Sequence, residues 1–263
     1  MSRRGRIGSE VRAGAKAFLR RRTAVFFTFF FPVIIVLIFG VLVGTQPTGG
    51  GLFAEPPGYY LPGYLAVVVL FTPLSRVGSE FARHREGSRF EKLATTPLRR
   101  WEWLLAHTLV NVLVIGAASL LIFGLVVALV GAEIAVGAHL LLLIPFVALG
   151  VTLFCGLGAI LGRLADSQDG VVAASNSVAL PLLFLSETFV TPDLLPAWFR
   201  PITNLSPLTY FARGVRYLTY ERVSIPVVGA TDPTTLALAN LGVLTVLATV
   251  FFLAGAYAVP RGD

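Results

Sequence analysis

Six long apolar stretches fill most of this 263-residue chain and are separated by short polar segments. A helix needs about 20 residues to cross a membrane, because each residue adds about 1.5 Å and the hydrocarbon core is about 30 Å thick. Each stretch meets or nearly meets that length. We therefore predict an all-α membrane protein with six transmembrane helices, at residues 25–44, 60–77, 104–130, 140–161, 171–189 and 236–259.

The composition supports a chain with little water-facing surface. Only 13% of the residues are charged, whereas about a quarter are charged in a typical soluble protein. The gaps between the stretches are too short for a soluble domain, so we divide the chain into a basic segment, residues 1–24, and a six-span domain, residues 25–263. The net charge of +7 is assigned to membrane lipids and topology rather than to nucleic acid.

Basic residues are distributed unevenly along the chain. Eight precede the first span and six follow the second span, and with the N-terminus in the cytoplasm all but four of the 21 lie inside. Lys and Arg are retained on the cytoplasmic side of membrane proteins. The pattern predicts a multi-pass protein of the cell membrane with both termini in the cytoplasm.

The basic N-terminal segment has helical periodicity. Apolar residues recur on one side of it, and Arg12, Lys16 and Arg20 lie off that side. This is typical of an amphipathic helix in the plane of the lipid headgroups. The alternative is a basic topogenic segment without a stable helix. The predicted apolar stripe consists of Ile7, Val11, Ala15, Phe18 and Leu19.

The cytoplasmic loop at residues 80–103 has signals for a short helix. Ser88 and Glu91 have the spacing of a capping box, and Gly87 permits a sharp entry. Pro97 ends the helix. The helix is amphipathic, so we expect it either to dock on a cytosolic partner or to rest on lipid headgroups.

The same loop resembles a segment of type-2 ABC transporter permeases that reads approximately E-R-E-x-G-T-x-E-x-L-x-x-T-P. In that family the segment forms a coupling helix that enters a cleft of the ATPase subunit. The resemblance implies that Phe90 and Leu93 make apolar contacts with the ATPase, and that Glu86 and Glu91 make polar contacts at the rim. The matching residues are Arg85, Glu86, Gly87, Ser88, Glu91, Leu93, Thr96 and Pro97.

The region before the last span, residues 190–222, is similar to the same family. There the family has short re-entrant helices that dip into the outer leaflet. The density of prolines favours broken helices independently of the resemblance. The matching positions are Ser186, Phe189, Pro192, Leu195, Pro196, Trp198, Pro207, Thr209, Tyr210 and Arg216.

Glu187 departs from the family pattern, in which a small residue is usual. A charge inside the membrane is unfavourable and often functional. We interpret Glu187 as a carboxylate on the translocation path that pairs with Arg200, Arg213 or Arg216. The alternative is a solvated carboxylate at the end of a helix.

Small and amide side chains inside the spans have ordinary packing roles. Gly156, Gly158 and Gly162 favour close contact between helices. The amides of Asn111, Asn176 and Asn240 are predicted to hydrogen bond across helices.

The resemblance implies the membrane subunit of an ABC exporter, close to the drug and glycolipid export branch. It would form a homodimer, or a heterodimer with a second permease, and bind two ATPase chains that hold ATP and Mg²⁺. The chain has no G-x-x-x-x-G-K-[ST] motif, and we predict no enzyme activity, cofactor or metal site in it. The apolar interior favours a lipophilic or amphiphilic cargo. The alternatives are an ion-coupled secondary transporter or a scaffold in a membrane complex.

Overall fold

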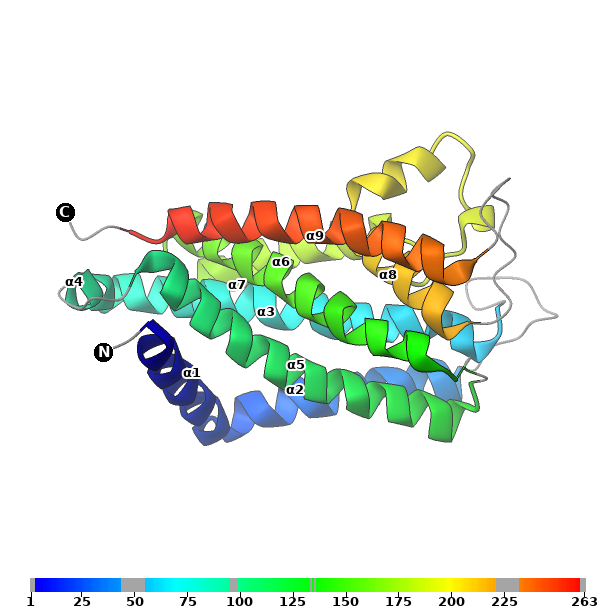
Figure 1. Ribbon diagram of the computed structural model, residues 1–263, viewed down its shortest axis with the longest axis horizontal. Helices are drawn as coiled ribbons and strands as arrows, with labels where there is room; N and C mark the ends of the chain where they lie inside the picture. Colours follow the sequence, from blue (N-terminus) through cyan, green and yellow to red (C-terminus); the bar gives the residue numbers. More distant parts are fainter. Residues whose placement is uncertain are drawn as a thin grey trace.

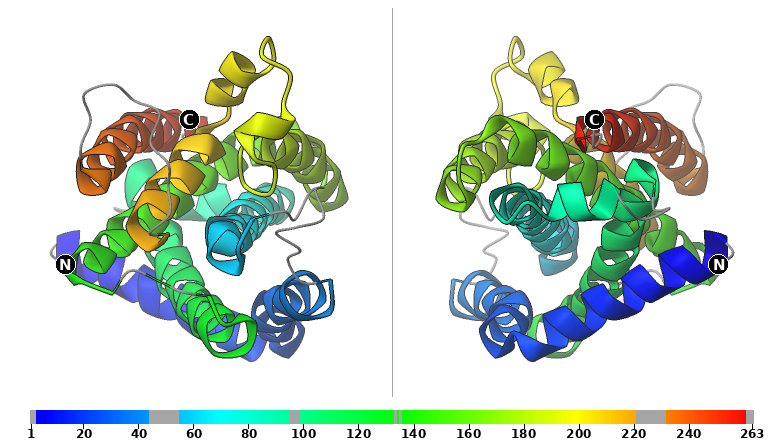
Figure 2. Two further views of the ribbon diagram at one scale, coloured as in Figure 1. Left: turned by 90° about the vertical axis from the view of Figure 1, so that its right-hand side faces the viewer. Right: turned by 90° about the vertical axis from the view of Figure 1, so that its left-hand side faces the viewer.

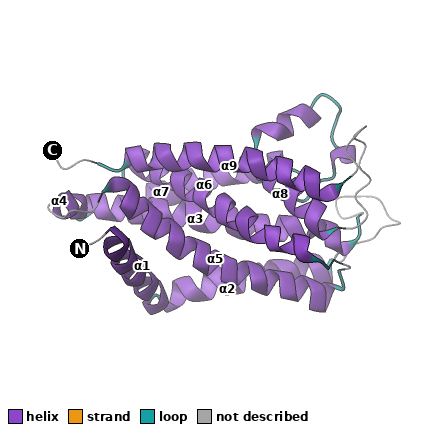
Figure 3. Cartoon of the chain, viewed as in Figure 1, coloured by secondary structure: helices purple, strands orange, loops and turns teal. Residues whose placement is uncertain are grey.

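The computed structural model describes residues 3–43, 55–94, 99–132, 134, 136–220 and 232–260. This part of the chain contains helices and no strand (Figure 3). Six helical segments are long and apolar enough to span a membrane, which confirms the predicted all-α, six-span fold. They are Arg22–Leu42, Pro57–Glu86, Arg100–Val130, Ala138–Leu164, Gln168–Leu185 and Pro233–Ala258.

Three of the spans combine two helix types. The first joins α2 (Arg22–Ile35) to a π-helical segment, and the second and fourth each begin with a 3₁₀ turn before α3 (Leu61–Glu86) and α6 (Leu143–Leu164). The other spans are single helices: α5 (Arg100–Val130), α7 (Gln168–Leu185) and α9 (Pro233–Ala258).

The shorter helices divide between the two ends of the bundle (Figure 1). At one end, called the inner end here, lie α1 (Arg3–Arg20), α4 (Arg89–Ala94) and the last turn of α9. At the opposite, outer end lie two 3₁₀ turns, Pro192–Leu194 and Arg200–Leu205, and α8 (Pro207–Thr219). The predicted coupling helix and the predicted re-entrant region are therefore on opposite sides of the bundle.

Helix α3 is the centre of the bundle. In the most apolar 18-residue segment of the span that contains α3, 78% of the residues are buried. The corresponding value is 17% in the spans that contain α2, α7 and α9. Figure 2 shows α3 enclosed by the surrounding helices. Many large apolar side chains of the surrounding helices are exposed, as expected of membrane spans, since lipid tails are as apolar as these side chains.

Glycines allow α6 to approach two neighbours closely. A Cβ atom on Gly156 would collide with the backbone of α9, and one on Gly255 would lie 2.6 Å from the Gly156 carbonyl oxygen. On the α3 side, a Cβ atom on Gly158 would lie 2.5 Å from a carbonyl oxygen of α3, and one on Gly162 would lie 2.7 Å from the Gly78 carbonyl. The three glycines of α6 thus occupy the close helix contacts for which they were predicted.

The predicted hydrogen bonds between helices were wrong for the amides of Asn111 and Asn240. The Asn111 amide donates to the His107 carbonyl at 2.8 Å, and the Asn240 amide donates to the Leu236 carbonyl at 2.8 Å. Both bonds stay within one helix, because a carbonyl one turn earlier is the nearest acceptor. Asn176 is exposed on α7.

Candidate functional site

The inner end of α3 is attached to the turn between α6 and α7. Helix α3 continues to Glu86, well beyond the predicted end of the second span. The Arg85 guanidinium donates to the carbonyl of Arg163 at 3.1 Å and to that of Ala165. Such a cation near the C-terminus of α6 interacts favourably with the helix dipole. Glu86 accepts hydrogen bonds from the backbone and side chain of Gln168 at 3.2 and 3.1 Å.

Phe90 holds α4 against the spanning helices. Its side chain is only 8% exposed, and its ring centroid lies 5.0 Å from that of Phe81 and 5.5 Å from those of His84 and Trp103. We call these four residues the aromatic cluster. The expectation that Phe90 presents an apolar surface to a partner was wrong, because α3 and α5 already cover that side of the helix.

The turn into α4 also differs from the predicted capping box. Ser88 has φ of +47°, whereas the residue that caps a helix N-terminus ordinarily has an extended backbone. Its amide instead closes a turn by donating to the Arg85 carbonyl at 3.1 Å. The left-handed residue of the turn is therefore Ser88 and not Gly87.

The exposed residues around α4 form what we call the α4 tip. It consists of Gly87, Ser88, Arg89 and Glu91, and it projects from the inner end of the bundle (Figure 1). Leu93 belongs to α4, but its side chain is not described, and Thr96 and Pro97 lie outside the described residues.

Helix α1 is joined to α5 by an ion pair that was not predicted from the sequence. An Arg6 Nη atom donates to Glu102 Oε1 at 2.9 Å, and the Glu102 side chain is fully buried. Glu102 Oε2 also accepts from the Arg99 amide at 2.9 Å, which caps the start of α5. The sequence contained one signal for the role of Glu102. It lies in the first turn of a span, and carboxylates favour helix N-termini.

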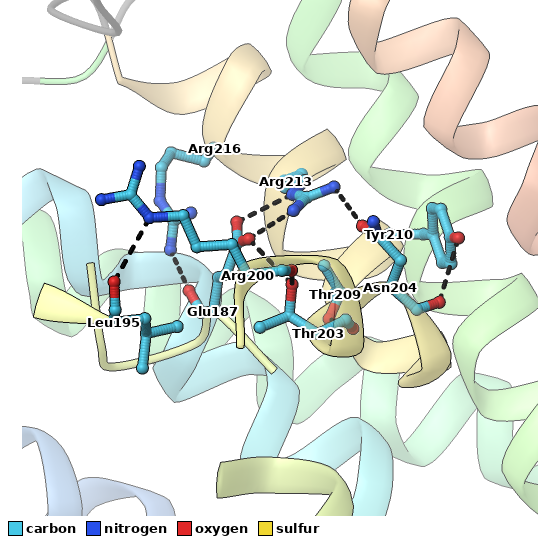
Figure 4. A network of polar contacts seen from close by, with 9 residues as sticks. All are labelled: Glu187, Leu195, Arg200, Thr203, Asn204, Thr209, Tyr210, Arg213 and Arg216. Atoms are coloured by element: carbon cyan, nitrogen blue, oxygen red, sulfur yellow. Dashed lines mark hydrogen bonds and ion pairs between the residues drawn. The ribbon is translucent and has the colours of Figure 1, made fainter. Parts of the chain in front are cut away.

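At the outer end Glu187 is buried and paired (Figure 4). It follows the end of α7 and is 3% exposed. Arg213 Nε donates to Glu187 Oε2 at 2.7 Å, a second Arg213 nitrogen donates to Oε1, and the Thr203 hydroxyl donates to Oε1 at 3.2 Å. The interpretation of Glu187 as a solvated carboxylate was therefore wrong. Arg213 is one of its three expected partners, and the hydrogen bond to Glu187 raises the pKa of Arg213.

The other two expected arginines make different contacts. The Arg216 side chain is almost fully buried, and it donates to the Glu187 backbone carbonyl at 2.6 Å and to the Tyr59 carbonyl at 3.4 Å. Its guanidinium lies 4.0 Å from the centroid of the Tyr59 ring, a cation–π contact. Burial lowers the pKa of Arg216 below its ordinary value. Arg200 donates to the Leu195 carbonyl at 3.3 Å.

The remaining predicted residues of this region shape the backbone or lie at the surface. Pro192 and Pro207 stand at the starts of a 3₁₀ turn and of α8, where proline is favoured. The Pro196 carbonyl accepts a backbone hydrogen bond at 2.8 Å. Trp198 is 71% exposed, and the Tyr210 hydroxyl donates to the Asn204 carbonyl at 3.0 Å.

Together these contacts form what we call the outer network, centred on Glu187, Arg213 and Arg216. It connects α8 with the end of α7 and with the turn that precedes α3. A change in these contacts would therefore weaken the attachment of α8 to two spanning helices at once.

Comparison with known proteins agrees with this geometry. The family model described as ABC-2 type transporter matches residues 7–220. The chain is 28% identical over 198 residues to the daunorubicin resistance ABC transporter permease protein DrrB1 of Streptomyces coeruleorubidus, a match that covers 72% of this chain and 66% of that relative, just under two thirds of its length. It is 24% identical over 237 residues to the inner membrane transport permease YadH of Escherichia coli (strain K12), covering 86% of this chain and 83% of that relative. The chain therefore belongs to the ABC-2 type transporter family, as the membrane permease subunit of an ABC transporter.

Proposed function

We propose that this permease exports a lipophilic or amphiphilic cargo, driven by ATP on a separate ATPase subunit. The apolar bundle supports such a cargo, and the drug resistance named for one relative favours outward movement. By the family resemblance, two ATPase chains act on a dimer of permeases, and they bind ATP and Mg²⁺. The inner end would then face the cytoplasm, together with both chain termini.

One observation carries the proposal: the α4 tip is exposed, yet it is connected to several spans. The aromatic cluster joins α4 to α3 and α5. Arg85 and Glu86, at the base of the tip, join α3 to the turn between α6 and α7. Force applied by an ATPase at Arg89 and Glu91 would therefore reach four spanning helices. The family resemblance adds Leu93, Thr96 and Pro97 to this proposed contact surface.

We further propose that the outer network and its surroundings line the exit path. Alternating access requires two packed states of the bundle, and an ion pair that forms in only one of them biases the equilibrium. Closing α8 against α3 and α7 through Glu187, Arg213 and Arg216 fits the inward-facing state. Pro192, Pro196, Trp198, Pro207 and Tyr210 shape the same region.

The position of the acidic residues argues against an ion-coupled carrier. Such carriers place carboxylates at mid-membrane. In the described parts of the spans, the acidic residues Glu80, Glu86, Glu102 and Asp169 lie near the inner helix ends. Glu187 lies beyond the end of α7, and both of its oxygens accept hydrogen bonds from Arg213.

The proposal is tested by co-expressing the chain with an ABC ATPase from the same genome and measuring co-purification and ATP hydrolysis. We expect Arg89→Glu to reduce the recovered ATPase at least tenfold, because the charge reverses at the proposed contact. The matched control is Arg12→Glu, which makes the same change on an exposed residue of α1. Equal recovery with Arg89→Glu and the control would contradict docking at the α4 tip.

A further inference from the structure

A small cavity with charged and apolar walls lies at the inner end of the bundle, beneath α1. Its volume is about 90 Å³, and its walls come from α1, the start of α2, α3 and α5. The polar residues that line it are Arg21, Arg76, Glu80, His107 and Asn111. None of the contacts proposed above for the ATPase or the cargo uses this cavity.

Arg76 brings to these walls a guanidinium that has no charged partner among the described residues. One of its Nη atoms is buried without a hydrogen-bond partner in the described part of the chain, and the guanidinium stacks 4.4 Å above the ring of Phe18. Asn111 Oδ1 and His107 Nε2 also have no partner there, but these two atoms have almost no accessible surface and are enclosed by protein. A largely buried guanidinium without an acceptor is unfavourable by several kcal/mol, so an anion beside Arg76 would stabilise this end of the bundle.

The charge balance around the cavity indicates an anion. Glu80, the one acidic residue of the wall, is already engaged by Arg83, and Arg21 lies 3.9 Å from it. The Glu80 carboxylate therefore does not neutralise Arg76. With Arg21, Arg76 and Arg83 set against one carboxylate, the surroundings of the cavity keep an excess of positive charge.

The size and position of the cavity select the kind of anion. A single water needs about 10–15 Å³ of such a cavity, so about 90 Å³ has room for a group the size of phosphate. Guanidinium groups are the preferred ligands of phosphate. Arg21 stands where α1 meets the first span, at the expected level of the lipid headgroups.

We propose that this cavity binds a phosphate group, supplied by an inner-leaflet phospholipid or by free phosphate, with Arg76 as its main ligand. Arg21 is the second cation of the cavity wall and would contact the same group. Bound in this way, the phosphate holds α1 against α3 and α5, so it adds to the Arg6–Glu102 ion pair in fixing α1.

The test uses the purified full-length permease in native mass spectrometry, after reconstitution in phosphatidylglycerol or phosphatidylcholine nanodiscs. We expect the wild-type protein to retain phospholipid, and Arg76→Gln to lower the retained fraction at least fivefold. Arg163→Gln is the matched control, because Arg163 is an exposed arginine of the same end that contacts only backbone in the described structure. Ala17→Leu is a second variant, which fills the cavity without removing a charge and should also lower retention.

A second arm separates the two sources of phosphate. Inorganic phosphate at millimolar concentration is added to delipidated protein, and the melting temperature is measured. A rise that Arg76→Gln abolishes assigns the site to free phosphate, whereas lipid retention without such a rise assigns it to a phospholipid. If wild type, Arg76→Gln and Ala17→Leu retain lipid equally and respond equally to phosphate, the cavity holds only water and the proposal is wrong.

Discussion

At the scale of single residues, the outer end depends on one buried carboxylate. Glu187 is held through its side chain by Arg213 and Thr203 and through its backbone by Arg216. Burying a charge is unfavourable unless it is paired, and removing one partner leaves the other uncompensated. Glu187 therefore stabilises the packing of α8 whether or not cargo passes beside it.

We expect Glu187→Gln to destabilise the protein by about 1–3 kcal/mol, because Arg213 loses its counter-charge. The partial exposure of Arg213 to solvent limits this loss. Thermal unfolding in detergent measures the change. The double variant Glu187→Gln/Arg213→Gln should recover part of the loss, since it leaves no unpaired charge. An unchanged melting temperature in the single variant would show that the pair contributes nothing to folding.

The residue types of this network were evident from the sequence, but their pairing was not. The sequence pattern singles out Glu187 and three candidate arginines. Arg213 and Arg216 are three positions apart on α8, and only the docking of that helix decides which one meets the carboxylate and which one meets backbone carbonyls. The contact of Arg216 with Tyr59 crosses 157 positions of the chain, so no local pattern contained it.

At the scale of helices, α6 is the element on which close packing depends. In membranes, helices associate by van der Waals contact and interhelical hydrogen bonds, so small residues at an interface matter more than apolar ones. Gly156 faces α9, and Gly158 and Gly162 face α3. Two neighbours are thus held by different glycines of one helix.

We expect Gly156→Ala to destabilise the protein by about 1–3 kcal/mol, because its Cβ atom would overlap the backbone of α9. Gly242→Ala in α9 is the matched control, since a Cβ atom there meets nothing within 4 Å and alanine favours a helix. Thermal unfolding of both variants in the same detergent provides the comparison. Equal melting temperatures would mean that α6 and α9 are further apart than described.

Local sequence signals predicted the position of the short helix α4 but not its orientation. The sequence predicted a helix in this loop that ends before Pro97, although the predicted capping box is not formed. The sequence did not show which residues of the helix face outward. The apolar side chain of Phe90 could contact a partner protein or the aromatic cluster, and only the tertiary structure places it in the cluster.

At the scale of the whole molecule, the two ends of the bundle have different chemistry. The inner end has the α4 tip and α1, and the outer end has α8 (Figures 1 and 2). The cavity beneath α1 lies at the inner end and the outer network at the outer end. Arginines of the inner end also donate to the last carbonyls of α9, since Arg100 contacts Tyr257 at 3.3 Å and Arg163 contacts Ala258 at 3.2 Å. Part of the positive charge that favours a cytoplasmic location therefore also caps helices.

The proposed orientation can be tested by cysteine labelling, because the single native cysteine, Cys155, is buried. Ser88→Cys at the inner end and Ala197→Cys at the outer end replace exposed residues. We expect a membrane-impermeant maleimide added to intact cells to label Ala197→Cys and not Ser88→Cys, and to label both after lysis. Labelling of Ser88→Cys in intact cells would place the α4 tip outside and would contradict ATPase docking there.

The sequence by itself determined the six spans, and it predicted their orientation and the places of a coupling segment and a re-entrant segment. These depend on helix length, charge and proline, which act locally and against the fixed thickness of a membrane. Only the tertiary structure decided that Phe90 is buried, that Glu187 pairs with Arg213 and that Arg76 lines a cavity. Those outcomes depend on which helix faces meet, and in a lipid environment hydrophobicity alone does not distinguish one apolar face from another.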